Sequence, residues 1–110
     1  MNPLDRKIVV GGAEYTARPD FEAMVNIEAG RDSIVDMLNR FVMKAPKMTD
    51  IARIVHACVV SGEAPRKVPD LHSFGQAMAK EPGGIMGFAV VAAELLSGLT
   101  AGEEKKKDAP

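Results

Sequence analysis

The chain has 110 residues, of which 14 are basic, 15 are acidic and 46% are apolar, with one cysteine and a formal net charge of -1. This length suits one domain of ordinary size, and the apolar content argues against wholesale disorder. The near-zero charge argues against a general nucleic-acid-binding protein, and one cysteine cannot form an internal disulfide, so we expect a small intracellular domain.

The first predicted element is a β-hairpin over residues 7–17, with a Gly-Gly pair at its turn. Two consecutive glycines can both adopt positive φ, as a two-residue hairpin turn requires. Pairing Val10 with Ala13 places Ile8 opposite Tyr15, and the alternation of side chains puts all four on one apolar face. Because an isolated hairpin is marginally stable, we expect this face to pack on helices or on another chain.

The chain after Pro19 is predicted to be helical, because apolar residues recur there at spacings of three and four. We expect the N-caps to be Asp20, Ser33 or Asp32, Thr49 and Asp70, with the first helix ending at Gly30 and a break at residues 81–84. The expected apolar stripes are Phe21, Met24 and Val25; Ile34, Met37, Leu38 and Phe41; Ile51, Ile54, Val55, Cys58 and Val59; Leu71, Phe74 and Met78; and Ile85, Phe88, Val91, Ala92, Leu95 and Leu99.

These elements predict a mainly α fold with a small β part, in which an N-terminal hairpin precedes four to five short helices. We expect one α-rich domain over residues 6–100 and a disordered charged tail over residues 101–110. The most apolar stretch, residues 85–99, is too short to span a bilayer and carries Glu94, so we expect no membrane segment. The N-terminus lacks the apolar segment of a signal peptide, and we expect a cytoplasmic protein.

Residues that could carry chemistry are few. His56 and Cys58 are two positions apart on one predicted helix, so they point to different faces, and Cys58 lies in an apolar stripe typical of a buried, inert thiol. The sequence has no pair of cysteines and no His-x-x-x-His spacing. We therefore expect no catalytic site, no cofactor and no metal ion.

Methionine is in excess, with seven in the chain. Met24, Met37 and Met78 fall on the helical stripes and are expected in the core. Met43 and Met48 flank a break at residues 44–47 and are harder to bury. We hypothesise that these two residues, with Phe41, form an exposed apolar patch that binds another protein, because thioether side chains adapt to varied apolar partners.

The order of elements resembles a known family. The hairpin is followed by an apolar helix that ends at a glycine (residues 21–30, FEAMVNIEAG), and a second apolar helix (residues 48–57, MTDIARIVHA) leads into a loop that contains glycine. Over roughly residues 6–99, this order is similar to the small tail-assembly proteins of phages, prophages and gene transfer agents.

The resemblance implies a tail assembly chaperone that works in the cytoplasm of a bacterial host during virion assembly. Its implied client is the tape measure protein, or another tail protein, and homo-oligomers are possible. The family supplies no fixed functional residues.

Two alternatives remain open. The first is a structural tail tube or connector subunit, although two strands are few for a subunit that builds an extended sheet. The second, which the net charge disfavours, is a small DNA-binding regulatory domain in which the basic residues gather on one face. Those residues are Arg31, Arg40, Arg53, Arg66 and Lys67.

Overall fold

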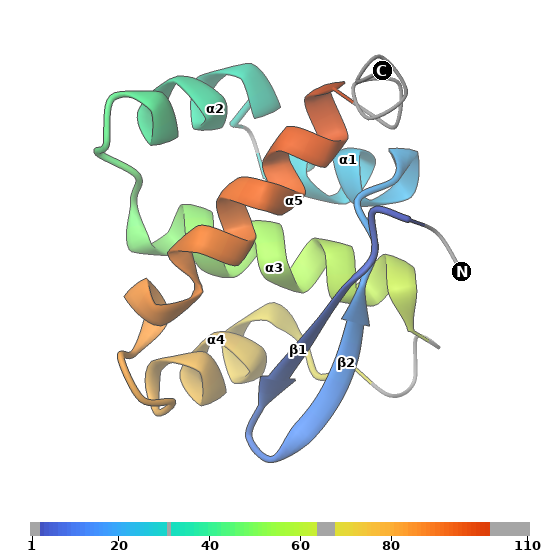
Figure 1. Cartoon of the computed structure of the whole chain (residues 1–110), viewed down its shortest axis with the longest axis vertical. Coiled ribbons are helices and arrows are strands. Elements are labelled where there is room, and N and C mark those ends of the chain that lie inside the picture. The colour runs from blue at the N-terminus through green and yellow to red at the C-terminus, as the bar shows by residue number, and fades with distance from the viewer. Residues whose placement is uncertain (1–2, 31, 64–67, 102–110) are drawn as a thin grey trace.

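The computed structural model of the chain describes residues 3–30, 32–63 and 68–101. The described residues form one two-stranded hairpin followed by five α-helices and a short 3-10 helix, so the predicted fold class is confirmed (Figure 1). Of the predicted tail, Ala101 is the last residue of the final helix, and residues 102–110 lie outside the described residues.

The hairpin consists of β1 (Arg6–Val10) and β2 (Ala13–Ala17), which pair antiparallel. The predicted register is confirmed, with Val10 opposite Ala13 at the turn. Both turn glycines have positive φ, at 62° and 82°, which explains why the turn needs residues without a Cβ atom.

The apolar face of the hairpin packs on the helices along most of its length. Ile8 and Val10 are buried, and the half-buried Tyr15 contacts the ring of Phe74 edge-on with 5.5 Å between the centroids. Ala13 is exposed, contrary to the prediction for this face, because it lies at the turn. The pairing was therefore predictable, but the extent of burial was not.

Helix α3 (Met48–Gly62) contributes more buried residues than any other described element, and its predicted stripe is confirmed. The predicted N-cap, Thr49, is wrong: the helix begins at Met48, and Lys47 is the N-cap. The cause is Asp50, whose carboxylate accepts a hydrogen bond of 2.9 Å from the backbone N–H of Lys47 and so places the N-cap two residues earlier. The buried stripe residues are Ile51, Ile54, Val55, Cys58 and Val59.

Helix α1 (Phe21–Glu28) begins as predicted, with the Asp20 carboxylate accepting a hydrogen bond of 3.0 Å from the backbone N–H of Ala23. It ends at Glu28, two residues before the expected Gly30, and Ala29 is its C-cap.

The predicted apolar stripe of α1 is wrong. Phe21 and Val25 are exposed, Met24 is half-buried, and Ala23 and Ile27 are the fully buried residues. Ala23 and Ile27 lie four positions apart and therefore share one face, which packs in the core. The largest apolar side chains thus did not mark the buried side of this helix.

Helices α2 (Ile34–Val42) and α4 (Leu71–Ala79) are capped as predicted by the side chains of Ser33 and Asp70, which accept from the backbone N–H groups three residues later. Their stripes are largely confirmed. Ile34, Met37, Phe74 and Met78 are buried, Leu38 and Phe41 are half-buried against the core, and Leu71 is partly exposed.

The last predicted helix is in fact two elements, the 3-10 helix η2 (Ile85–Phe88) and α5 (Ala89–Ala101). Gly83 and Gly84 both have positive φ and break the chain before η2, as the break at residues 81–84 predicts. A further glycine, Gly87, lies inside the short helix, and glycine is a poor α-helix former. In α5, Ala92, Leu95 and Leu99 are buried as predicted and Leu96 is buried as well.

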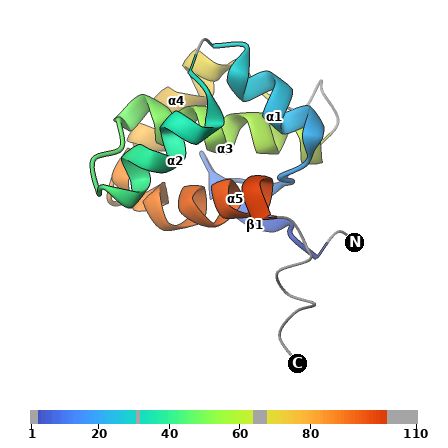
Figure 2. The ribbon, with the colours of Figure 1, turned by 90° about the horizontal axis from the view of Figure 1, so that it is seen from above.

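In space, α5 crosses α3. Helix α4 lies on one side of α3, and helices α1 and α2 lie on the other (Figure 1). Seen from above, β1 and α5 lie on the same side of α3 (Figure 2). The two strands and all five α-helices contribute buried apolar residues to a single core. This arrangement leaves the α2–α3 connection at one end of the molecule (Figures 1 and 2).

Candidate functional site

The three residues predicted to bind a partner lie around the α2–α3 turn, the connection between Val42 and Met48. Met43 is the C-cap of α2 and is 75% exposed, and Met48 opens α3 and is 42% exposed. Phe41 differs from these two, because it is half-buried and packs against the core. Val42, which the sequence did not single out, is 69% exposed and adds a further apolar side chain to the turn.

The turn has a defined backbone structure. The backbone N–H of Lys44 donates to the carbonyl oxygen of Phe41 at 3.0 Å, and that of Ala45 donates to the carbonyl oxygen of Arg40 at 2.8 Å. This pair of bonds is the Schellman motif that ends many helices. Lys44 occupies the position at which glycine is usual, with φ of 60°.

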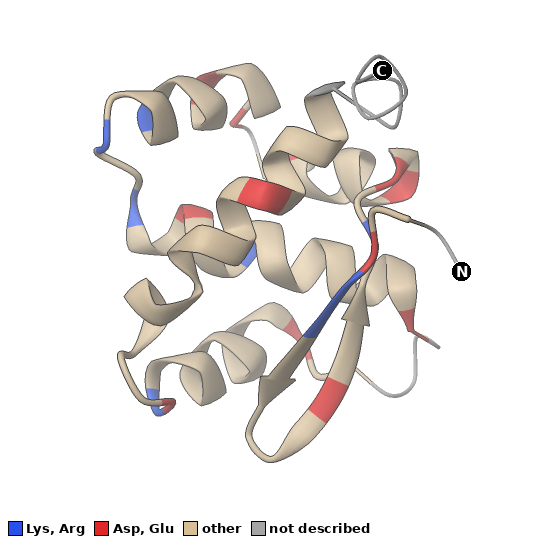
Figure 3. Cartoon of the chain, in the orientation of Figure 1, with Lys and Arg blue, Asp and Glu red and all other residues tan. Residues whose placement is uncertain are grey.

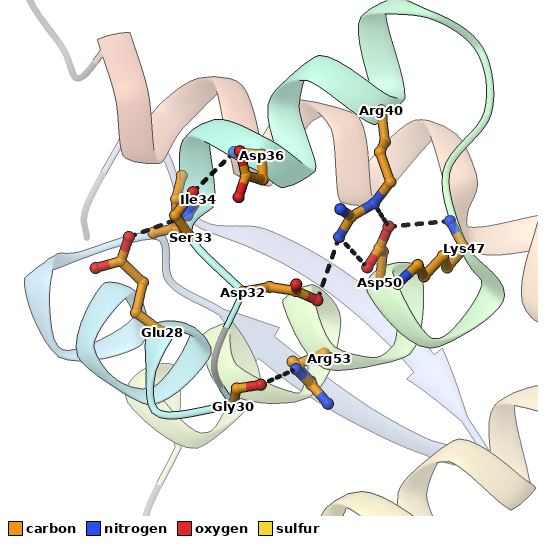
Figure 4. Close-up of polar contacts among 10 residues, drawn as sticks. All are labelled: Glu28, Gly30, Asp32, Ser33, Ile34, Asp36, Arg40, Lys47, Asp50 and Arg53. Atoms are coloured by element: carbon orange, nitrogen blue, oxygen red, sulfur yellow. Dashed lines mark hydrogen bonds and ion pairs between the residues drawn. The ribbon is translucent and has the colours of Figure 1, made fainter.

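A buried ion pair fastens the two helices across the turn (Figure 4). The Arg40 guanidinium donates to both carboxylate oxygens of Asp50, at 2.7 and 2.8 Å, and also to Asp32 at 3.3 Å. Asp50 is 2% exposed and also accepts the backbone N–H of Lys47. The Asp50 carboxylate therefore accepts three hydrogen bonds, which hold α2 and α3 together across the turn. We call this arrangement of Arg40, Asp50 and the Lys47 N–H the clamp.

Within the clamp, Arg40 and Asp50 each stabilise the charged form of the other. Burial alone raises the pKa of Asp50, but the hydrogen bonds from Arg40 and Lys47 and their positive charges outweigh it, and the pKa is lowered below its ordinary value. The hydrogen bond to Asp50 raises the pKa of Arg40 in turn. Both groups are thus ionised at neutral pH.

The other end of α2 is fastened as well. The carboxylate of Glu28 accepts the backbone N–H of Ile34 at 3.0 Å, and Arg53 donates to the carbonyl oxygen of Gly30 at 3.1 Å (Figure 4). Such bonds supply partners for backbone groups that a helix leaves unpaired at its ends. Both ends of α2 are therefore held by polar contacts as well as by its buried stripe.

Exposed apolar side chains also lie on η2 and α5, outside the α2–α3 turn. Met86 of η2 and Val90 of α5 are both exposed, and η2 packs against α3. An apolar groove of about 690 Å³ between α3 and α4 is lined by Thr49, Ala52, Leu71 and Ile85, among others. Leu71 and Ile85 belong to the predicted apolar stripes, whereas the sequence does not single out Met86 or Val90.

The residues considered for chemistry do not meet. Burial raises the pKa of the Cys58 thiol to about 12, so the thiol stays protonated at neutral pH. His56 Nε2 lies 2.8 Å from the carbonyl oxygen of Pro69, and its ring contacts Phe74. Within residues 3–30, 32–63 and 68–101, no group of three His, Cys, Asp or Glu residues could hold a metal ion.

The basic residues of the DNA-binding alternative are partly engaged inside the protein. Arg40 is paired with Asp50, and Arg53 donates to a backbone carbonyl. Arg31, Arg66 and Lys67 lie outside the described residues.

A family model described as "Phage tail tube protein, GTA-gp10" matches residues 5–102, from before β1 to the end of α5. The chain belongs to this phage tail tube protein family. The resemblance to phage and gene-transfer-agent tail proteins is thereby confirmed, and the chain is a phage tail protein that functions with other tail proteins. Neither the curated proteins nor the solved structures contain a match.

None of the helices within residues 3–30, 32–63 and 68–101 is both long and apolar enough to cross a bilayer.

Proposed function

We propose that this member of the GTA-gp10 tail family is a non-catalytic tail assembly chaperone that works in the bacterial cytoplasm and binds the tape measure protein during assembly. The observation that carries the proposal is the set of exposed apolar side chains at the clamped α2–α3 turn, namely Val42, Met43 and Met48.

The physical argument starts from the client. A long tail protein exposes apolar surface before the tube encloses it, and exposed apolar surface promotes aggregation. A chaperone must cover such surface without requiring one specific sequence. Met43 and Met48 suit this task, because methionine side chains can adapt to differently shaped apolar partners.

The clamp supports the same proposal. Binding costs less free energy when the binding surface is ordered beforehand. The Arg40–Asp50 pair and the hydrogen bonds that end α2 hold the backbone of the turn, so only the flexible methionine side chains have to adjust.

The second candidate is a structural subunit that stays in the tail tube, and the description of the family favours it. A tube requires repeated contacts between copies. The described part of the chain has a single two-stranded sheet, and its strand edges are where such contacts would extend the sheet.

The test is to tag the protein, express it with its own tail gene cluster, and compare what co-purifies with what finished particles contain. A chaperone should recover the tape measure protein and be absent from purified particles. Retention in particles at stoichiometric amounts would favour the tube subunit instead.

The variant Met43→Ser/Met48→Ser tests the surface itself. It should reduce recovery of the tape measure protein while leaving the melting temperature almost unchanged, because both side chains are already exposed. The matched control is Phe21→Ser/Val25→Ser, which removes two exposed apolar side chains from α1 and should retain the partner. A large loss of melting temperature in the methionine variant would assign those residues to the core.

A further inference from the structure

The α2–α3 turn is positively charged as well as apolar. Between Arg40 and Thr49 the chain carries three basic residues and no acidic one. Arg40 pairs with Asp50, and the exposed Lys44 and Lys47 supply the remaining positive charge of the turn. Figure 3 shows basic positions and no acidic one along the connection from α2 to α3, and within the described residues neither lysine forms a salt bridge.

The backbone of Lys44 provides a second, independent observation. A residue with a Cβ atom is strained at φ of 60°, and glycine would hold the same Schellman motif without that strain. Backbone strain of this kind clusters at sites of function. Here the strained position presents an exposed ammonium group beside Met43.

We propose that the α2–α3 turn recognises an acidic amphipathic segment, whose apolar side chains contact Val42, Met43 and Met48 while its carboxylates face Lys44 and Lys47. This inference rests on the proposed function and specifies the chemistry of the bound partner. The lysines lie at the rim of the surface, so they contribute mainly to the association rate and to discrimination against basic segments.

The experiment uses two synthetic helical peptides that share one stripe of leucines, flanked by glutamates in the first and by lysines in the second. The full chain should bind the glutamate peptide more tightly, and this preference should shrink as salt is added. The variant Lys44→Gln/Lys47→Gln should weaken binding of the glutamate peptide by roughly threefold to tenfold, the effect of two exposed ion pairs. The control Lys7→Gln/Lys80→Gln removes the same charge elsewhere and should bind as the unchanged chain does.

Lys44→Gly separates binding from folding. It relieves the strain at the turn, so the melting temperature should rise by a few degrees while affinity for the glutamate peptide falls. A merely structural lysine would give the first change without the second. Equal affinity for the two peptides, or no effect of Lys44→Gln/Lys47→Gln, would overturn the inference, as would binding of the turn to a second copy of this chain in place of the peptide.

The two proposals can fail separately. If the tape measure protein is captured through Met43 and Met48 but capture is indifferent to both lysines and to salt, the acidic chemistry is wrong and the chaperone proposal stands. If the glutamate peptide is preferred and the tape measure protein is not captured, the turn recognises acidic segments and the proposed client is wrong.

Discussion

Replacing Asp50 with alanine should destabilise the protein by about 3 kcal/mol. The carboxylate is 2% exposed and accepts two hydrogen bonds from Arg40 and one from the backbone N–H of Lys47. The loss of an N-terminal helix contact costs about 1 kcal/mol, and the loss of a largely buried ion pair costs about 2 kcal/mol more, because Arg40 can still reach water. For a domain of this size, the melting temperature should fall by roughly 10–20 °C.

The assay is urea denaturation followed by far-ultraviolet circular dichroism, with Asp50→Asn and Glu94→Ala beside Asp50→Ala. Asp50→Asn keeps an acceptor for the Lys47 N–H and should cost about 1 kcal/mol less than the alanine variant. Glu94 pairs with Arg6 at the exposed surface, so its removal should cost at most about 1 kcal/mol. Equal effects of Asp50→Ala and Glu94→Ala would refute the reasoning that the Arg40–Asp50 clamp is stronger because it is buried.

The difference in unfolding free energy between the unchanged protein and Asp50→Ala should also depend on pH. Because the pKa of folded Asp50 lies below its ordinary value of 3.8, its contribution is fully present above that value and is lost as the pH falls through the lowered folded pKa. The unchanged protein and Asp50→Ala should therefore differ most near neutral pH and converge in acid. A gap that stays constant down to the acid-unfolding range would contradict the assignment of the stability to the ionised carboxylate.

Three further predictions concern the core. Met37→Ala should cost about 2–5 kcal/mol in urea denaturation, because Met37 is fully buried; a cost below about 1 kcal/mol would place the side chain outside the core. Gly62→Ala should lower the melting temperature markedly, since an added Cβ atom would clash with the backbone carbonyl of Thr16, and an unchanged melting temperature would show that α3 and β2 can separate locally. Cys58 should resist a thiol reagent at pH 8 until urea unfolds the protein, because burial raises its pKa to about 12; fast labelling of the native protein would indicate local opening of α3.

Much of the secondary structure was predictable because its causes are local. Two consecutive glycines with alternating apolar neighbours are sufficient to predict the hairpin and its register. Asp20, Ser33 and Asp70 cap helices through bonds to backbone groups only three residues away, so the sequence contains both partners. The sequence indicates the wrong N-cap, Thr49, because the carboxylate of the neighbouring Asp50 binds the backbone N–H of Lys47 instead.

The candidate site was predictable only in part. The break around Pro46 indicates that Met43 and Met48 are hard to bury, and both are exposed. The Arg40–Asp50 pair was not foreseen, because these residues lie on different helices and only the path of the turn between them brings them together. Only the three-dimensional structure therefore reveals that this pair holds the α2–α3 turn in place.

Periodicity along the chain determines which segments are helical and that an amphipathic helix has a buried face, because both depend on neighbours within one or two turns. Which face of a mixed helix is buried depends on what packs against it. In α1, the core takes up Ala23 and Ile27 and leaves Phe21 and Val25 in solvent, although the latter pair is larger and more apolar. Close packing buries the helix face whose shape fits the neighbouring elements. This fit involves segments that are distant in the sequence, so it exists only once the chain has folded.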